Sequence, residues 1–334
     1  MSATTEVRQD KSGNIFDAES FLEYLRPSKS HWWEGGVGKE SCPWVFRGHA
    51  SSKWKLIPSA FRSNCINELS PLISYFESLP VAECQSQQWE TLTKNQKTYL
   101  HNSLAYGQAM YDFLTSCYEF GLLDFQTSNN FPQDYKKMEF KSADLDGGYF
   151  QCFTDFPSED SRVFRKYYEV AQHYGVPTHL LDWSKSPLYA AHFATTSWLE
   201  ADDTKADIAV WAIKEFQEQG IPKYNCNLSL FAPSIINNVN AKAQLGRFTV
   251  ISRDGAKNYF HEYGSYPAIE DFFPVESDPN SYQIQKIVLC SEHVPGLRNL
   301  LDREGITNAR LKPGFDSIVS TIKSSWKNLS NYSK

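Results

Sequence analysis

The sequence predicts one domain of the α+β class. Apolar residues recur at helical spacing through much of the first half of the 334-residue chain, whereas short apolar runs typical of strands alternate with helices in the second half. Hydrophobic residues make up 41% of the chain, which is enough to bury a sizeable core. We therefore expect a single domain over residues 1–334, interrupted by a helical insertion at about 63–165.

The first half is expected to be mainly helical. Helical spacing of apolar residues is found at 18–25, 71–76, 96–120 and 161–172. One short strand, Trp44 to Gly48, is expected to end in a turn. Proline and glycine breakers between 127 and 160 predict a loop-rich stretch.

The second half is expected to supply most of the sheet. Strand patterns are found at 178–183, 207–213, 244–252 and 285–290. Helices are predicted at 187–199, 297–304 and 315–326. Pro187 stands at the first-turn position of its helix, where the N–H that proline lacks is not needed.

Composition and charge exclude several classes of protein. The net charge is -6 and the 22% of charged residues are mixed in sign, unlike a disordered acidic or basic tail. A global basic footprint for nucleic acid is absent, so nucleic acid could be bound only by a local patch or by aromatic stacking. Most of the aromatic residues, 15% of the chain, are expected to lie in the core.

We expect a cytoplasmic protein with no membrane partner. Met1 to Asp10 is polar, unlike a signal peptide, and no run of 18 apolar residues predicts a transmembrane helix. The seven cysteines are scattered and none has Cys-x-x-Cys spacing, which favours neither a zinc ribbon nor a disulfide framework. They are typical of buried thiols in a reducing compartment.

The common motifs of nucleotide and metal sites are absent. The chain has no Gly-x-x-x-x-Gly-Lys-Ser/Thr, no Gly-x-Gly-x-x-Gly and no His-Glu-x-x-His. His173 and His179 flank a Gly-Val-Pro turn, which is not the spacing of metal ligands on one helix face. We therefore expect no metal site.

Two charged residues stand within apolar runs. Arg47 follows Trp44-Val45-Phe46, and Asp182 follows Leu180-Leu181. A buried charge needs a partner, because an unpaired one costs several kcal/mol. One interpretation is that Arg47 and Asp182 pair across adjacent strands. The other is that Arg47 lies at the edge of a cleft, where its rigid fork grips a phosphate or diphosphate.

Several blocks of the chain resemble the FRG domain family. Phe46-Arg47-Gly48, followed by Leu56, Pro58 and Arg62, is similar to the family's opening motif. The stretch from Ala171 to Trp183, continued by Ser186 to Ala194, resembles its most specific signature. Later blocks are similar at Gln244 to Thr249, at Gly305-Ile306 and at Pro313 to Asp316. The family usually has Arg where His179 stands and Thr where Ser184 stands, which weakens any role assigned to these two positions.

The order of the blocks is in turn similar to the ADP-ribosyltransferase fold. That resemblance implies a split sheet of mixed and antiparallel strands, with NAD as the substrate. In the arginine class of these enzymes, the site begins with an aromatic-Arg-Gly strand end, as at Phe46 to Gly48. A strand bearing a hydroxyl and a helix with Ala-x-x-Phe follow, as at Ser184 and Ala190 to Phe193. Gln244 stands about where the last strand carries a catalytic Glu.

The resemblance implies a role for each of these residues. Catalysis is assigned to Gln244, Asp182 and Arg47, and cofactor binding to Arg47, Gly48, His173, Tyr174, Trp183 and Ser184. Arginine suits the diphosphate, an aromatic side chain can stack on nicotinamide, and a carboxylate or amide can bond the ribose hydroxyls. Cleavage of the nicotinamide–ribose bond passes through an oxocarbenium-like state, which preorganised polar groups stabilise.

Gln244 leaves one requirement open, because an amide adds no negative charge beside a cationic transition state. Asp182 or a later carboxylate (Glu262, Glu270 or Glu276) would supply that charge, or the domain binds without catalysing. Gln244 also fits a polar position in a half-exposed strand, and His173-Tyr174 also fits a packed turn.

The function expected from the resemblance is an NAD-dependent ADP-ribosyltransferase, a transferase of bacterial toxin or phage-defence type. It would modify a protein or nucleic-acid acceptor, and an antitoxin or other regulatory protein would restrain it. The alternatives are a non-catalytic module that binds a nucleotide or protein, and a glycohydrolase that destroys NAD. Residues 63–165 are expected to carry the acceptor or partner surface.

Overall fold

The structure is a computed structural model of the 334-residue chain. It describes residues 4–9, 12–33, 42–80, 86–122, 167–201, 206–214, 228–233, 242–273, 284–319 and 321–322. All statements below concern these residues.

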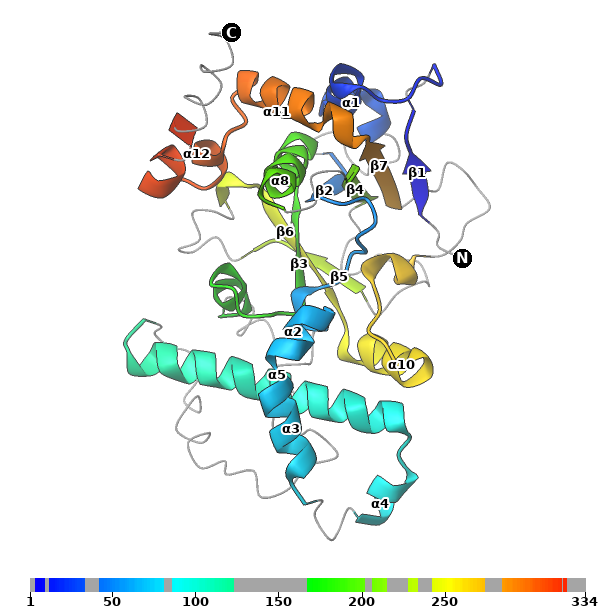
Figure 1. Ribbon diagram of the computed structural model, residues 1–334, viewed down its shortest axis with the longest axis vertical. Coiled ribbons are helices and arrows are strands. Elements are labelled where there is room, and N and C mark those ends of the chain that lie inside the picture. The colour runs from blue at the N-terminus through cyan, green and yellow to red at the C-terminus, as the bar shows by residue number, and fades with distance from the viewer. Residues whose placement is uncertain are drawn as a thin grey trace.

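Seven strands form one mixed sheet in the described residues (Figure 1). In chain order they are β1 (Thr5–Val7), β2 (Trp44–His49), β3 (Leu180–Ser184), β4 (Ile208–Lys214), β5 (Leu228–Phe231), β6 (Gly246–Ile251) and β7 (Ile284–Leu289). Their order in the sheet is β1-β7-β4-β2-β3-β6-β5. Only β1 and β7 pair in parallel, and the other neighbours are antiparallel.

The sheet is nearly divided between β2 and β3. These two strands share a single paired position, Phe46 with Ser184. By contrast, β2 pairs with β4 over six positions and β3 pairs with β6 over five. The two wings of the sheet are therefore joined at one point, and beyond it the strand edges separate.

Side chains alternate between the two faces of the sheet and so build two cores. On one face, Phe46 and Val210 pack with α1 (Ala18–Leu25), α8 (Pro187–Glu200) and α11 (Val294–Arg303). On the other face, Val45 and Trp211 belong to a core that includes Met110 of a long helix, α5 (Lys94–Glu119). Figure 1 shows α1, α8 and α11 at one end of the molecule and α5 at the other.

The described part of the predicted insertion is helical. It contains α2 (Ser63–Glu68), α3 (Ser70–Ser78), α4 (Ser86–Thr91) and α5, and α5 packs against α3 and α10 (Arg253–Tyr263). A capping box starts α5, because Thr93 and Gln96 each accept a hydrogen bond from the other's backbone N–H. The stretch 127–160, predicted to be loop-rich, lies outside the described residues.

Most elements predicted from the sequence are confirmed. The helix expected at 18–25 is α1, with Phe21, Leu22 and Leu25 buried. The helix expected at 187–199 is α8, which begins at Pro187 after the capping side chain of Ser186. Residues 167–173 are helical within the helix expected at 161–172, whose first six residues lie outside the described part.

The sequence prediction missed or displaced other elements. It missed β1, β5, α10 and the short helix α12 (Asn308–Leu311). The strand expected from Gln244 begins only at Gly246, and the strand expected from Thr178 begins at Leu180. The α+β class and the mixed sheet are confirmed at this level. No helix in the described residues is both long and apolar enough to cross a membrane.

Candidate functional site

A cavity opens where β2 and β3 separate. Its volume is about 440 Å³, within the range of pockets that hold small molecules and cofactors. It is lined by seven of the eight residues that the sequence analysis selected: Arg47, Gly48, His173, Asp182, Trp183, Ser184 and Gln244. These residues come from four separate segments of the chain, so the fold gathers them.

Arg47 is held at the divided edge of the sheet. Its Nη1 donates a hydrogen bond to the backbone oxygen of Asp182 at 2.8 Å, and its Nε donates to Nε2 of His49 at 3.1 Å. The Arg47 side chain is 18% exposed. Burial lowers the pKa of Arg47 to about 10, so the guanidinium stays charged at neutral pH. These two bonds use two of the five N–H groups of the guanidinium.

Asp182 faces the same cavity and is the more open of the two. Its Oδ2 lies 3.6 Å from Arg47 Nη1, and the Asp182 side chain is 57% exposed. Its Oδ1 accepts a hydrogen bond from Gln172 Nε2 at 2.5 Å, and Gln172 Oε1 in turn accepts one from the hydroxyl of Thr178. The ion pair and the position at a cavity, considered as alternatives for Arg47 from the sequence, therefore occur together.

Ser184 fixes the backbone around Gln244. Ser184 Oγ donates to the backbone oxygen of Gln244 at 2.7 Å and accepts from the backbone N–H of Ser186 at 3.0 Å. The next residue, Leu245, has a φ of 53°, a left-handed conformation that is uncommon for leucine. Gln244 thus lies in a turn before β6 and not in the strand, and its Nε2 donates to the backbone oxygen of Leu311 at 3.1 Å.

Gly48 lets α8 pack directly on β2. A Cβ at Gly48 would lie 1.9 Å from the backbone oxygen of Ala190 and 2.7 Å from the backbone nitrogen of Ala194. Both contacts are with main-chain atoms of a buried helix, which cannot move aside as a flexible side chain can. Gly48 therefore allows α8 to pack behind the cavity. Glycine is required here for this packing, and the same residue also lines the cavity.

The aromatic candidates differ in their surroundings. The indole of Trp183 is buried and donates from Nε1 to Thr249 Oγ1 at 2.9 Å. His173 is exposed and lines the cavity, whereas Tyr174 is 74% exposed and lies outside the lining. Of these three, His173 presents an accessible ring to a ligand.

Sequence reasoning missed four further polar residues of the cavity. Glu169 is only 4% exposed, and Gln172, Ser197 and Lys312 also line the cavity. A signal was present, because Glu169, Gln172 and His173 are three and four residues apart and so share one helix face.

Of the later carboxylates, the two that the structure describes do not line the cavity. Glu270 is buried elsewhere and accepts a hydrogen bond from the backbone N–H of Leu56 at 3.0 Å. Burial raises the pKa of Glu270 to about 6. Glu262 is exposed and absent from the lining, and Glu276 lies outside the described residues.

A buried polar network joins α8 to the segment that holds Gln244. His192 contacts Asn308 Oδ1 through Nε2 at 2.8 Å and Arg298 Nη1 through Nδ1 at 3.3 Å. Burial, assisted by the Arg298 charge, lowers the pKa of His192 to about 4. Neutral His192 thus anchors the first residue of α12, and Leu311 at the end of α12 receives the Gln244 hydrogen bond.

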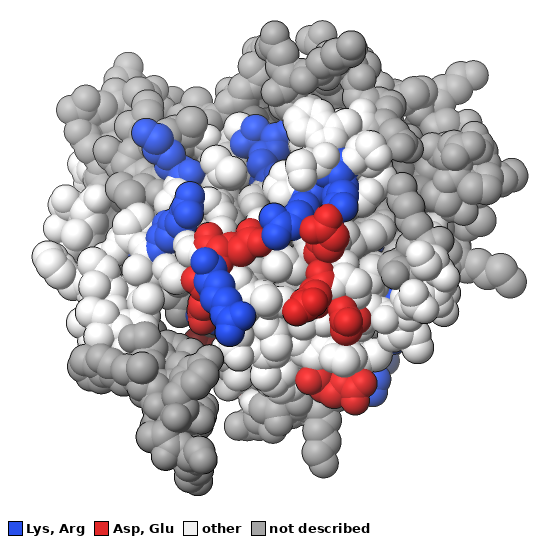
Figure 2. Space-filling view, turned by 90° about the horizontal axis from the view of Figure 1, so that it is seen from above, with Lys and Arg blue, Asp and Glu red and all other residues white. Residues whose placement is uncertain are grey.

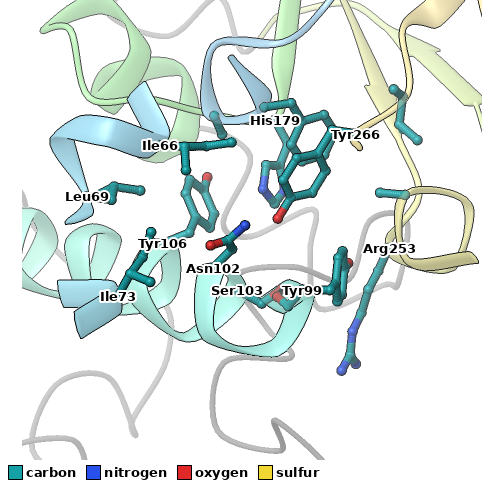
Figure 3. A pocket seen from close by; sticks show the side chains of 14 residues that line it. Ile66, Leu69, Ile73, Tyr99, Asn102, Ser103, Tyr106, His179, Arg253 and Tyr266 are labelled. Carbon is teal, nitrogen blue, oxygen red and sulfur yellow. Dashed lines mark hydrogen bonds between the residues drawn. The ribbon is translucent and has the colours of Figure 1, made fainter. Parts of the chain in front are cut away.

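His179 has a packing position in a second, much smaller cavity (Figure 3). The space is about 20 Å³, enough for about one water molecule. The imidazole of His179 stacks on Tyr106 of α5 at 4.2 Å between ring centroids and lies 4.8 Å from the ring of Phe61. Burial lowers the pKa of His179 to about 3, so the ring is neutral at physiological pH.

The comparisons with known proteins give one match. Residues 137–203 match the FRG domain. This FRG segment is about a fifth of the chain, and its described part contains residues 167–173, β3 and α8. It therefore includes Asp182 and Ser184 of the cavity, whereas Arg47 and Gln244 lie outside it. Neither the curated proteins nor the solved structures give a significant match.

Proposed function

We propose that the chain binds NAD in the cavity between β2 and β3 and transfers its ADP-ribose to a macromolecular acceptor. The observation that carries the proposal is the convergence of Arg47, Asp182, Ser184 and Gln244 on one cavity of about 440 Å³. The FRG segment includes β3 and α8 and supports the resemblance to the FRG family there. The ADP-ribosyltransferase resemblance supplies the rest of the proposal.

Arg47 is the proposed anchor for the diphosphate. Its orientation is set by two hydrogen bonds to protein atoms, so little conformational entropy is lost when a ligand binds. A charged guanidinium gives short, charge-assisted bonds to phosphate oxygens. Lys312, also in the lining, adds a second positive charge.

Asp182 is the proposed source of negative charge beside the reacting ribose. Two described carboxylates line the cavity, and Asp182 is 57% exposed whereas Glu169 is 4% exposed. A ligand can therefore reach Asp182 without displacing packed protein. Gln172 orients the Asp182 carboxylate by donating to Oδ1. Gln244 contributes an amide for a ribose hydroxyl once its bond to Leu311 is exchanged.

The reaction is a substitution at C1′ of the nicotinamide-bearing ribose. The C1′–N bond breaks and neutral nicotinamide leaves with the electron pair. An acceptor oxygen or nitrogen then forms the new bond to C1′ and releases its proton to solvent or to a carboxylate. The negative charge of Asp182 would stabilise the cationic transition state.

The direct test is to incubate the purified chain with NAD labelled in the adenylate and with cell lysate. We expect label in macromolecules that is removed by protease or by nuclease, together with free nicotinamide. Nicotinamide without a labelled acceptor would favour an NAD glycohydrolase, the second candidate. That candidate is favoured by Gln244, since a site without glutamate there lacks one group for activating an acceptor. NAD binding with neither product would leave a non-catalytic module.

A further inference from the structure

The loop that joins β2 to α2 exposes an aromatic side chain between two lysines. Lys53, Trp54 and Lys55 are all exposed, and Trp54 is 52% exposed. The stretch 47–62 also contains Arg47 and Arg62 and no Asp or Glu. A local concentration of positive charge therefore exists in a chain whose net charge is -6.

The exposed tripeptide is held on a rigid base. On one side, the backbone N–H of Ser52 donates to the backbone oxygen of Asp207 at 2.6 Å. On the other side, the Leu56 N–H donates to the buried Glu270 carboxylate at 3.0 Å, and the Ile269 N–H donates to the Leu56 oxygen at 2.9 Å. A fixed loop loses little conformational entropy when a ligand binds, because the backbone that carries Trp54 is already ordered.

This loop adjoins the cavity through a chain of contacts. The ring of Trp54 lies 6.0 Å from the ring of His49, between centroids, and His49 Nε2 accepts the hydrogen bond from Arg47 Nε at 3.1 Å. Arg62 is tied to the same loop, because its Nε donates to the backbone oxygen of Ile57 at 3.0 Å. A ligand that lies on Trp54 is thus next to the Arg47 side of the cavity.

The neighbouring acidic groups already have protein partners. Asp182 pairs with Arg47 and accepts from Gln172, and Asp207 pairs with Arg8 at 3.1 Å. Glu270 is buried beneath Leu56. The loop therefore keeps its positive character.

Elsewhere, the surface in Figure 2 mixes both signs of charge. That view looks onto the end of the molecule where Figure 1 places α1 and α11, and side chains of both signs are present there. Arg26 pairs with Glu304 and Glu23, each at 2.7 Å, which neutralises the groove between these helices. This surface does not offer the single sign of charge that a polyanion needs.

We propose that Trp54, Lys53, Lys55 and Arg62 form a binding patch for single-stranded nucleic acid, which the neighbouring cavity then modifies. An exposed indole stacks on any unpaired base, and flanking ammonium groups bind the phosphates on either side. The bases of a duplex are stacked on one another and cannot lie flat on the indole. The identification of the acceptor rests on the proposed function, whereas the binding patch can be tested without it.

The test measures fluorescence anisotropy with fluorescein-labelled 15-nucleotide RNA and DNA strands and the matching duplex. We expect the full chain to bind single strands more tightly than the duplex. Trp54→Ala should weaken binding about tenfold and Trp54→Phe should retain most of it, consistent with the loss of one base stack. Trp33→Ala is the matched control, because Trp33 is 41% exposed and its Nε1 donates to the backbone oxygen of Pro27, just after α1.

The lysines are tested by salt dependence. The double variant Lys53→Gln/Lys55→Gln should reduce the slope of log affinity against log salt by about 1.4, which is about 0.7 for each lost phosphate contact. Lys94→Gln, an exposed lysine at the start of α5, should leave the slope unchanged. Equal binding by wild type and Trp54→Ala, or displacement of RNA by polyglutamate as readily as by unlabelled RNA, would overturn the patch.

A titration with NAD in the absence of nucleic acid tests NAD binding separately from nucleic-acid binding. It therefore distinguishes a failure of the binding patch from a failure of the proposed function. Trp54→Ala should bind NAD as the wild type does. If this variant loses NAD binding while its RNA binding is unchanged, Trp54 belongs to the NAD site and the inference is wrong. If RNA binding depends on Trp54 while Arg47→Ala leaves NAD binding unchanged, the patch stands and the NAD assignment fails.

Discussion

Arg47 of β2 donates a hydrogen bond from Nη1 to the backbone oxygen of Asp182 in β3, at 2.8 Å. The bond spans the two wings of the sheet close to their one paired position, Phe46 with Ser184. Because the acceptor is a main-chain atom, this hydrogen bond does not require the Asp182 carboxylate. The positioning of Arg47 and the charge of Asp182 can therefore be tested separately.

Replacing Arg47 by lysine should weaken NAD binding about tenfold or more. Lysine lacks the planar fork that fits phosphate, and a hydrogen bond to a charged group contributes about 1.5–3 kcal/mol. Isothermal titration calorimetry with NAD measures the effect. Asp182→Asn is the control, since it leaves the backbone acceptor in place and should retain binding. Wild-type affinity in Arg47→Lys would contradict the role of Arg47.

Replacing Gly48 by alanine should destabilise the fold by about 3 kcal/mol or more. The new Cβ would lie 1.9 Å from the Ala190 backbone oxygen, so α8 has to shift away from β2. The free energy of unfolding in urea gives the measurement. Gly314→Ala is the matched control, because a Cβ there meets no atom within 4 Å. Equal stability of the two variants would refute the close packing of α8 on β2.

Ser184→Ala should cost about 1–3 kcal/mol of stability and should also lower NAD turnover. The change removes the hydroxyl that donates to the Gln244 carbonyl and accepts from the Ser186 N–H, so both backbone groups lose a hydrogen bond. Chemical denaturation and nicotinamide release report the two effects. Ser184→Thr keeps a hydroxyl and should restore both, and a threonine variant as impaired as alanine would argue against this hydrogen-bond role.

The stability of the protein should depend on the protonation of His192. Its pKa in the folded state is about 4, below the usual 6.5, so the unfolded chain binds the proton more readily. The stabilisation is complete above pH 6.5 and is lost as the pH falls toward 4. Between pH 7 and 5, the free energy of unfolding should fall by about 2 kcal/mol more in wild type than in His192→Gln. Parallel pH profiles of the two proteins would exclude this contribution.

The sequence predicts much of the fold because its strongest patterns are local. Apolar spacing and Pro187 define α1 and α8, which occur where they are expected. The short edge strands β1 and β5 were missed, since strands of three and four residues carry little periodic signal. Gln244 was expected in a strand, but Ser184 and the left-handed Leu245 hold it in a turn.

From the sequence, the individual residues of the candidate site could be predicted, but not their position around one cavity. Arg47, Asp182 and Gln244 are far apart in the chain, and only the divided sheet brings them to one cavity. The packing reason for Gly48 depends on the backbone of Ala190, which no local pattern reveals. Glu169 was missed because apolar spacing predicts the helix but does not indicate which of its polar residues face a cavity.

The central claim is that the cavity cleaves NAD. The most direct measurement is the release of nicotinamide from NAD by the purified chain in the presence of lysate, followed by chromatography. We expect release by wild type and a decrease of about a hundredfold or more in Arg47→Ala and in Asp182→Asn, the latter with NAD binding retained. Absence of nicotinamide above the protein-free background, or equal release by all three proteins, would contradict the claim.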